Sequence, residues 1–305
     1  MSYSNISRTD LELSKGISNC AALSRIACLC QPLNDFLSHE NIILPPGNAV
    51  LVDFKAASIA ILGMALTGAA NAQSALNEIL SSGVLKVGTT GDWNPMTVRD
   101  PATNSYKGFD IDIMEELAKD LGVEVEFVPT DWKTLVNGVV AGQYHITGSA
   151  SISPARMKAA GFSESYISVE IVPFTAKENA GKFDGHEAIN QTGVKVATTL
   201  GTTFEKLVRT WYPNADIKVV EAPARGYQEV LAGRADVFIT SNIEGSTLEE
   251  KFGVARVSNA EARSPTPIAM LLPQTDQVWI NYVNNWVKVK EAKGFFEANK
   301  AKWGL

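Results

Sequence analysis

The side chains best suited to chemistry are scattered along this chain and do not form a known catalytic motif. His145 and His186 stand apart, and neither belongs to an H-x-x-x-H pattern or a carboxylate cluster of the kind that binds a metal ion. Thr89-Thr-Gly91 is not a phosphate-binding loop, and no G-x-S-x-G elbow presents a nucleophilic serine. The sequence therefore predicts neither a metal ion nor a cofactor.

One carboxylate lies in a recognisable local pattern. Thr202-Thr-Phe-Glu205 has the S/T-x-x-E spacing of a helix capping box, in which Glu205 accepts a hydrogen bond from the Thr202 amide. A carboxyl group that donates a proton in a reaction must be protonated, whereas a helix N-terminus favours the anion unless burial raises the pKa. The pattern therefore favours a capping role for Glu205.

The elements that position these residues follow a pattern that occurs twice. The first copy is predicted as strand 84–89, helix 109–121 ended by Gly122, strand 123–127, helix 133–141 and strand 144–148. Asp110 or Asp112 is expected to cap the first helix. The second copy is predicted as strand 194–199, helix 203–212, strand 217–221, helix 227–232 and strand 236–240. Strands that alternate with helices predict parallel sheets.

Two such units predict an α/β fold with two lobes and a cleft between them. We expect lobe 1 to comprise residues 75–174 and 268–305, and lobe 2 to comprise residues 175–267. Extended stretches at 169–176 and 267–273 join the lobes, and the tail at 276–303 is helical. Ligands bind beyond the carboxyl ends of parallel strands, where helix N-termini point at them. This rule predicts four site segments, at 90–95, 148–156, 200–205 and 241–244.

Composition limits the class of protein and its partners. The chain has 305 residues, of which 45% are hydrophobic and 20% charged, so it is globular and long enough for two domains. Its net charge of −6, without a basic run, argues against nucleic acid or an anionic membrane as the main partner. No apolar run reaches the roughly 18 residues that span a bilayer.

The N-terminal region is predicted to lie outside the fold. Residues 52–72 read as a cleaved secretory signal peptide, with Lys55 as its positive end and Ala70-Asn-Ala72 as its cleavage site. Because such a peptide begins a chain, residues 1–51 are interpreted as an upstream extension that arises from a start site assigned too early. All three cysteines lie in this extension, which leaves the mature chain without a thiol and suits a bacterial periplasm.

The chain from Ala75 to Leu305 resembles the family 3 extracellular solute-binding proteins, the polar amino-acid receptors of ABC transporters. The motifs that carry the resemblance are Gly108-Phe-Asp-Ile-Asp112, Ser151-Ile-Ser-Pro-Ala-Arg156, Gly201-Thr-Thr-Phe-Glu205 and Ala232-Gly-Arg-Ala-Asp236. The segments 89–95 and 127–135 resemble the branch of the family that contains cyclohexadienyl dehydratase, which converts prephenate and arogenate. The resemblance implies the type II periplasmic-binding-protein fold, with helices on both faces of each lobe's sheet.

The resemblance also implies roles for individual residues. Arg156 matches the arginine that grips the ligand carboxylate, and a guanidinium fork suits this bidentate contact. The other matching positions are Ser151 and Ser149 beside the carboxylate, Trp93 and Trp132 as a sandwich around the ligand side chain, and Thr202 and Thr203 from lobe 2.

One position departs from the family pattern. Ser241 stands where the family usually has the aspartate that pairs with the ligand α-ammonium. Glu244 is either a substitute one helical turn away or, as we favour, a solvated carboxylate in the first turn of a helix. Arg225 is either a second cationic contact or a surface residue, and Asp92 is a further possible contact. These features shift the expected ligand toward an organic acid or a modified amino acid.

The sequence therefore predicts a periplasmic solute-binding protein that closes on a small carboxylate and delivers it to an ABC permease in the inner membrane. We expect a monomer that binds no nucleic acid and no cofactor. The alternative is a periplasmic cyclohexadienyl (prephenate/arogenate) dehydratase on the same scaffold. Glu205 falls where that enzyme's general acid is expected, and expulsion of the ring hydroxyl needs a protonated carboxyl beside it.

Overall fold

The structure is a computed structural model, and it describes residues 73–305. The predicted signal peptide and the upstream extension, residues 1–72, lie outside the described residues. Among the residues that are described, no helix is both long and apolar enough to cross a membrane.

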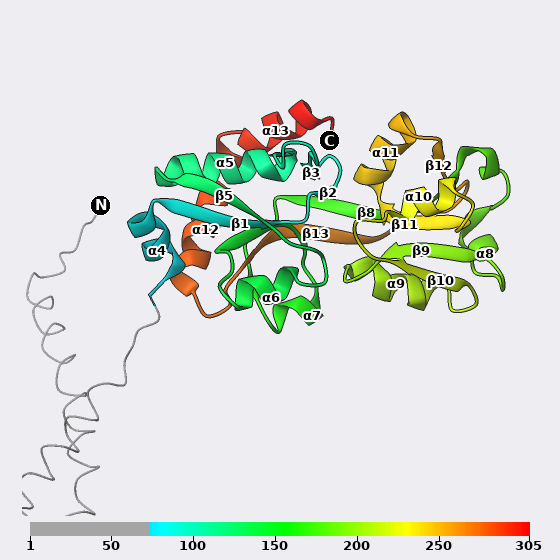
Figure 1. The fold of residues 1–305 in the computed structure, drawn as a ribbon, viewed down its shortest axis with the longest axis horizontal. Helices are drawn as coiled ribbons and strands as arrows, with labels where there is room; N and C mark the ends of the chain where they lie inside the picture. The colour runs from blue at the N-terminus through cyan, green and yellow to red at the C-terminus, as the bar shows by residue number, and fades with distance from the viewer. Residues whose placement is uncertain (1–72) are drawn as a thin grey trace, which may run out of the picture. The chain divides into compact units, whose positions relative to one another are not determined.

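A mixed β-sheet runs through the described residues in the strand order β10-β9-β11-β8-β13-β6-β1-β5 (Figure 1). We call the part built on β1, β6 and β5 the first half of the sheet, and the part built on β9, β10 and β11 the second half. Their bounds are β1 Val84–Thr89, β5 Glu124–Pro129, β6 Ile146–Ser151, β9 Lys195–Thr199, β10 Asp216–Val220 and β11 Val237–Ser241. Within each half the strands pair in parallel, as the alternation of strands and helices predicts.

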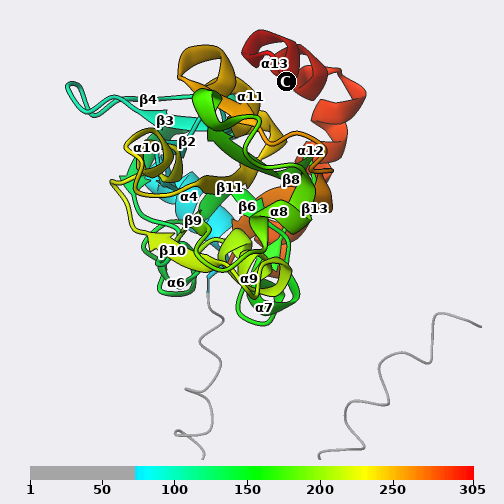
Figure 2. The same cartoon turned by 90° about the vertical axis from the view of Figure 1, so that its right-hand side faces the viewer.

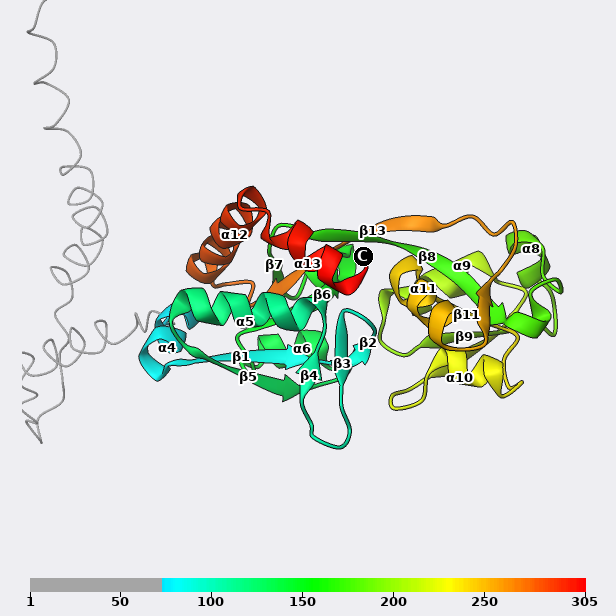
Figure 3. The ribbon, with the colours of Figure 1, turned by 90° about the horizontal axis from the view of Figure 1, so that it is seen from above.

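The two halves are joined by long strands that the sequence suggested only as extended stretches. These strands, β8 (Ile167–Ala176) and β13 (Arg263–Leu272), run antiparallel to each other and to their neighbours β11 and β6. Figure 3 shows both strands passing from the first half into the second. The prediction of two parallel units is confirmed, and their sheets are continuous because β8 and β13 hydrogen-bond to each other.

Helices cover both faces of the sheet. Figures 1 and 2 show α6, α7 and α9 on one face, and α11 and α13 on the other. The helix bounds are α4 Ala75–Ser82, α5 Phe109–Leu121, α6 Leu135–Val140, α7 Pro154–Met157, α8 Gly185–Ile189, α9 Thr203–Trp211, α10 Gly226–Leu231, α11 Asn242–Lys251, α12 Gln277–Ala292 and α13 Phe295–Trp303. The predicted helical tail is two helices, because Gly294 adopts a left-handed conformation with φ of 72°.

Short strands complete the described fold. A small separate sheet contains β2 (Asp92–Trp93), β3 (Thr97–Arg99) and β4 (Tyr106–Lys107), which connect β1 to α5. Two further short strands, β7 (Gly161–Phe162) and β12 (Val254–Arg256), pair with β13 and β8.

Helix α5 begins and ends where its pattern predicts, but its cap differs. Gly122 ends the helix in the left-handed region, whereas the N-cap is Gly108, without a side-chain hydrogen bond. The prediction that Asp110 or Asp112 caps α5 is therefore wrong. Asp112 instead accepts hydrogen bonds from Lys302 and Trp303 of α13, at 2.6 and 2.7 Å, and Asp110 turns into the protein interior.

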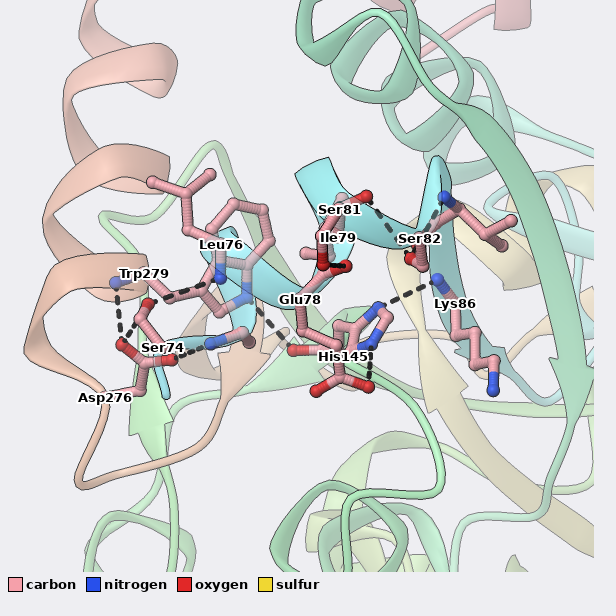
Figure 4. A network of polar contacts seen from close by, with 12 residues as sticks. Ser74, Leu76, Glu78, Ile79, Ser81, Ser82, Lys86, His145, Asp276 and Trp279 are labelled. Carbon is pink, nitrogen blue, oxygen red and sulfur yellow. Dashed lines mark hydrogen bonds and ion pairs between the residues drawn. The ribbon is translucent and has the colours of Figure 1, made fainter. Parts of the chain in front are cut away.

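A polar network attaches the first described helix to the sheet (Figure 4). Asp276 accepts hydrogen bonds from the Ser74 hydroxyl at 2.8 Å and from the backbone N–H of Ala75 at 2.6 Å. Its neighbour Trp279 donates its indole N–H to the backbone carbonyl of His145 at 3.1 Å, and Nδ1 of His145 accepts from the Lys86 amide at 3.0 Å. His145 thus joins α12 to β1 and has a structural role, in agreement with its isolated position in the sequence.

Candidate functional site

A cavity lies between the two halves of the sheet, beyond the carboxyl ends of their parallel strands. All four predicted site segments contribute to its walls. The residues that matter for its chemistry are Asp92, Trp93, Trp132, Ser149, Ser151, Arg156, Thr202, Thr203, Arg225, Thr240 and Glu244. The rule that ligands bind beyond parallel strand ends therefore located this cavity from the sequence.

Arg156 brings a buried positive charge to the cavity. It lies in α7, whose N-cap Ser153 accepts a hydrogen bond from the Arg156 backbone N–H at 3.4 Å. The guanidinium donates to the backbone carbonyl of Ser151 at 3.3 Å, and no carboxylate of residues 73–305 forms an ion pair with it. Burial lowers its pKa to about 10, so the group remains charged at neutral pH and is available to an anion.

Arg225 supplies a second guanidinium from the other half of the sheet. It is the N-cap residue of α10, and its Nη1 donates a hydrogen bond to the backbone carbonyl of Asp92 in β2. The Arg225 side chain also lines the cavity. Arg225 therefore lies at the cavity, and its role as a second cationic contact stays a prediction.

Glu244 is the residue at which the structure departs most from the role that the sequence favoured. A solvated first-turn carboxylate was favoured, but the carboxyl group turns into the cavity, where the Thr240 hydroxyl donates a hydrogen bond to its Oε2. Burial raises its pKa to about 7, and the nearby Asp92 charge adds to this, while the Thr240 bond and the Arg225 charge oppose it. In the structure Glu244 is thus a cavity-lining carboxyl group that is hydrogen-bonded to Thr240, and not a solvated surface carboxylate.

Asp92 is the second carboxyl group of the cavity. The indole N–H of Trp132 donates to its Oδ1 at 2.8 Å. Burial raises the pKa of Asp92, against the opposing effects of Thr90, Arg225 and Trp132. The cavity therefore combines two guanidinium groups with two carboxyl groups whose pKa values are raised by burial.

The two tryptophans line the cavity but do not face one another. The ring centroids of Trp93 and Trp132 are 6.0 Å apart with an angle of 76° between the planes. This is an edge-to-face arrangement, in which the two rings form a corner of the cavity. Both residues are at the cavity, and the predicted sandwich around a ligand side chain stays a prediction.

Ser149 and Ser151 form the wall beside Arg156. Ser149 has a positive φ of 59°, and a buried network holds it there. Its hydroxyl donates to Asp110, its backbone N–H donates to the Tyr166 oxygen at 2.9 Å, and Tyr166 donates to Asp110 at 2.6 Å. Burial raises the pKa of Asp110 to about 7, opposed by the Tyr166 bond. Sequence reasoning assigned Asp110 to a helix cap and missed this supporting role.

The second half contributes unpaired hydroxyl groups. Thr198 and Thr203 line the cavity, and their buried Oγ1 atoms have no hydrogen-bond partner within the described part of the chain. Buried polar groups without partners are costly, so a ligand that hydrogen-bonds to them gains affinity. Thr202 also lines the cavity, and its hydroxyl donates to the Thr199 carbonyl at 2.7 Å.

The structure does not bring Glu205 or Ser241 into the cavity lining. Glu205 accepts from the backbone N–H of Gly201 at 3.2 Å and pairs with Arg209 at 3.5 Å. It therefore stabilises the start of α9, although its partner is the Gly201 amide and not the predicted Thr202 amide. Ser241 is fully buried and caps α11 by accepting from the Glu244 N–H at 3.2 Å.

Comparison with known proteins identifies the family. Residues 85–305 match the bacterial extracellular solute-binding proteins, family 3, and the chain belongs to this family. It is 31% identical over 250 residues to the cyclohexadienyl dehydratase of Pseudomonas aeruginosa, covering 81% of this chain and 92% of that protein. It is also 25% identical over 244 residues to the L-cystine-binding protein TcyJ of Escherichia coli, covering 80% of this chain and 90% of that protein.

Solved structures agree with this assignment. The crystal structure of the ancestral amino acid-binding protein AncCDT-1, a precursor of cyclohexadienyl dehydratase, superposes with a TM-score of 0.71 at 35% identity. The match covers 75% of this chain and 99% of that one. The fold is thus the two-lobed α/β fold of periplasmic binding proteins, as predicted.

Proposed function

We propose that this protein is a dehydratase that eliminates water from a carboxylated cyclohexadienol such as prephenate, with Glu244 as the proton donor. The observation that carries the proposal is the Glu244 carboxyl group, which faces the cavity with a pKa raised to about 7. A general acid works best when its pKa lies near the working pH. This proposal keeps the dehydratase alternative and moves its general acid from Glu205 to Glu244.

The charges of the cavity match those of the proposed substrate. Prephenate carries two carboxylates and a ring hydroxyl. The guanidinium groups of Arg156 and Arg225 suit the two carboxylates, and the neutral Glu244 carboxyl suits the hydroxyl. An ionised glutamate in the same place would repel the dianion, so a raised pKa serves both binding and catalysis.

The proposed step balances without a cofactor. Glu244 transfers its proton to the ring hydroxyl, and the ring C–O bond breaks as water leaves. The electron pair of the bond between the ring and its carboxylate moves into the ring, carbon dioxide leaves, and the ring becomes aromatic. The products are phenylpyruvate, water and carbon dioxide, and Glu244 recovers its proton from solvent. The two arginines hold the dianion in place for this transfer.

Similarity to known proteins supports the proposal. The relative named cyclohexadienyl dehydratase is matched over 92% of its length, and AncCDT-1 is described as a precursor of that enzyme. We further propose that the protein is exported to the periplasm through a signal peptide at residues 52–72. N-terminal sequencing of the exported protein should then begin at Gln73, and recovery of residues 1–51 would contradict this.

A second candidate is a receptor for a small carboxylate that works with an ABC permease. Membership of the solute-binding family favours it, and so do Arg156 and the unpaired threonine hydroxyls, which suit a carboxylate without any chemistry. With Ser241 buried, the cavity lacks the aspartate that usually pairs with an α-ammonium, and this favours an organic acid.

One experiment separates the two candidates. Purified protein is incubated with prephenate while phenylpyruvate is followed by absorbance, and binding is measured in parallel by calorimetry. Enzymatic turnover well above the spontaneous rate supports the dehydratase. Tight binding of prephenate, a keto acid or an amino acid without any phenylpyruvate would overturn it and leave the receptor.

A further inference from the structure

The residue that caps α11 is tied to the opposite half of the sheet. Ser241 is fully buried, and its hydroxyl oxygen accepts two hydrogen bonds. One comes from the backbone N–H of Glu244 at 3.2 Å, and the other from the indole N–H of Trp93 at 3.1 Å. Trp93 belongs to β2 and to the hydrophobic core of the first half, whereas Ser241 and Glu244 belong to the second.

A second contact holds the first turn of α11 against the first half of the sheet. Ile243, which directly precedes Glu244, packs against the hydrophobic core that contains Trp93. The first turn of α11 is therefore held by an apolar contact and a hydrogen bond that both originate in the first half. Neither contact involves a ligand.

We infer that Trp93 is a positioning residue, which couples contact between the two halves of the sheet to the placement of the Glu244 carboxyl group. The inference deepens the proposed function and rests on it for its kinetic consequence. When the halves are in contact, the Trp93 indole fixes the Ser241 oxygen, Ser241 fixes the backbone of Glu244, and the carboxyl group faces the cavity. The proton donor is then in place only when the two halves of the sheet are in contact.

The groups that face Glu244 come from three further elements. Thr240 at the end of β11 donates to its Oε2, Arg225 before α10 contributes a positive charge, and Asp92 in β2 contributes a carboxyl group. Asp92 is the sequence neighbour of Trp93, so the same strand of the first half sets both the position and the electrostatic surroundings of Glu244. Release of the Trp93 bond should admit water to the carboxyl group.

The test removes each end of the link separately and together. Trp93→Phe removes the indole N–H, Ser241→Ala removes its acceptor, and Trp93→Phe with Ser241→Ala removes both. Trp211→Phe is the matched control, because the Trp211 indole N–H has no hydrogen-bond partner among residues 73–305. In protein labelled with ¹³C-glutamate, the Glu244 carboxyl signal is assigned by its absence in Glu244→Gln, and its titration midpoint is followed by NMR.

The titration midpoint of Glu244 should be near 7 in the wild type and in Trp211→Phe. It should move toward 4.5 in each of the two single variants, Trp93→Phe and Ser241→Ala. The two single variants should each lower kcat about tenfold with little change in KM, and the double variant should be no worse than either, since all break one link. An unchanged midpoint in both variants, or a raised KM with additive effects, would overturn the inference. If the wild type has no activity, the proposed function fails and the midpoints alone decide the inference.

Discussion

Glu205 and Glu244 occupy equivalent places in their helices, and their surroundings give them different roles. Each is the third residue of a helix that follows a capping Thr202 or Ser241, so both have the S/T-x-x-E spacing. Glu205 turns back to the Gly201 amide, whereas Glu244 turns toward Thr240 and the cavity. The spacing was visible in the sequence for both residues. The direction of each side chain depends on residues far away in the chain, and a local pattern cannot predict it.

Arg156 should dominate the affinity for a carboxylate. Its guanidinium is buried, charged and without a carboxylate partner in the described chain, so Arg156→Ala should weaken ligand binding by roughly a hundredfold or more. The control is Arg209→Ala, because Arg209 is an exposed arginine whose one ion pair among residues 73–305 is with Glu205. Calorimetry measures both. Undiminished binding by a folded Arg156→Ala variant would remove Arg156 from the site.

Glu244 should make the protein less stable as the pH rises. Burial raises its pKa from 4.5 to about 7, so the folded state holds a proton that the unfolded state has lost in this interval. Stability falls with pH wherever the folded state binds more protons, so the free energy of unfolding should decrease between these values. Glu244→Gln removes this contribution. Between pH 4.5 and 7, the melting temperature of Glu244→Gln should rise relative to that of the wild type as the pH increases. If the two melting temperatures change with pH in parallel, the raised pKa of Glu244 is contradicted.

At the scale of elements, prediction succeeded where the pattern was long and regular. Helix α5 was predicted to the residue, because its apolar residues recur at helical spacing and Gly122 ends it in a left-handed conformation. The strands β2, β3 and β4 have only two or three residues each, too few to establish a period. Helix α11, which carries Glu244, has no continuous apolar face, so only its first turn was expected from the sequence, and its extent to Lys251 was not.

Helix α11 packs in its observed position only because residue 245 is a glycine without a side chain. A Cβ atom at this position would lie 2.0 Å from ring atoms of Phe174, which is buried in the core of the second half. Gly245→Ala should therefore displace α11 and cost about 1–3 kcal/mol of stability, with a loss of activity because Glu244 moves. Ser246→Ala, at the exposed next residue of α11, should change stability by less than about 0.5 kcal/mol. Equal melting temperatures for the two variants would show that Phe174 yields.

On the scale of the whole molecule, the repeated strand-helix pattern predicted two similar halves, but not how closely they meet. Gly201 in the second half has a φ of 78°, and a Cβ there would lie 2.6 Å from the backbone of Lys133 in the first half. Contacts of this kind join segments far apart in sequence. They follow from the packing of the complete chain, and a local pattern does not contain them.

Gly201→Ala should therefore keep the halves from meeting around a ligand. Gly193→Ala is a matched control, because Gly193 also has a positive φ, of 84°, but faces open space. Both variants incur backbone strain of about 1 kcal/mol, so their stabilities should fall similarly, whereas only Gly201→Ala should raise KM or weaken binding by about tenfold or more. Equal ligand affinity in the two variants would contradict the close approach at Lys133.

The central claim is that Glu244, and not Glu205, donates the proton. The most direct measurement compares the conversion of prephenate to phenylpyruvate by the wild type, Glu244→Gln and Glu205→Gln. Glutamine keeps the shape of each side chain and, at position 205, can still accept the Gly201 hydrogen bond. We expect Glu244→Gln to lower kcat by roughly a hundredfold or more with little change in KM, and Glu205→Gln to stay near the wild type. Activity retained in Glu244→Gln, or lost only in Glu205→Gln, would contradict the claim.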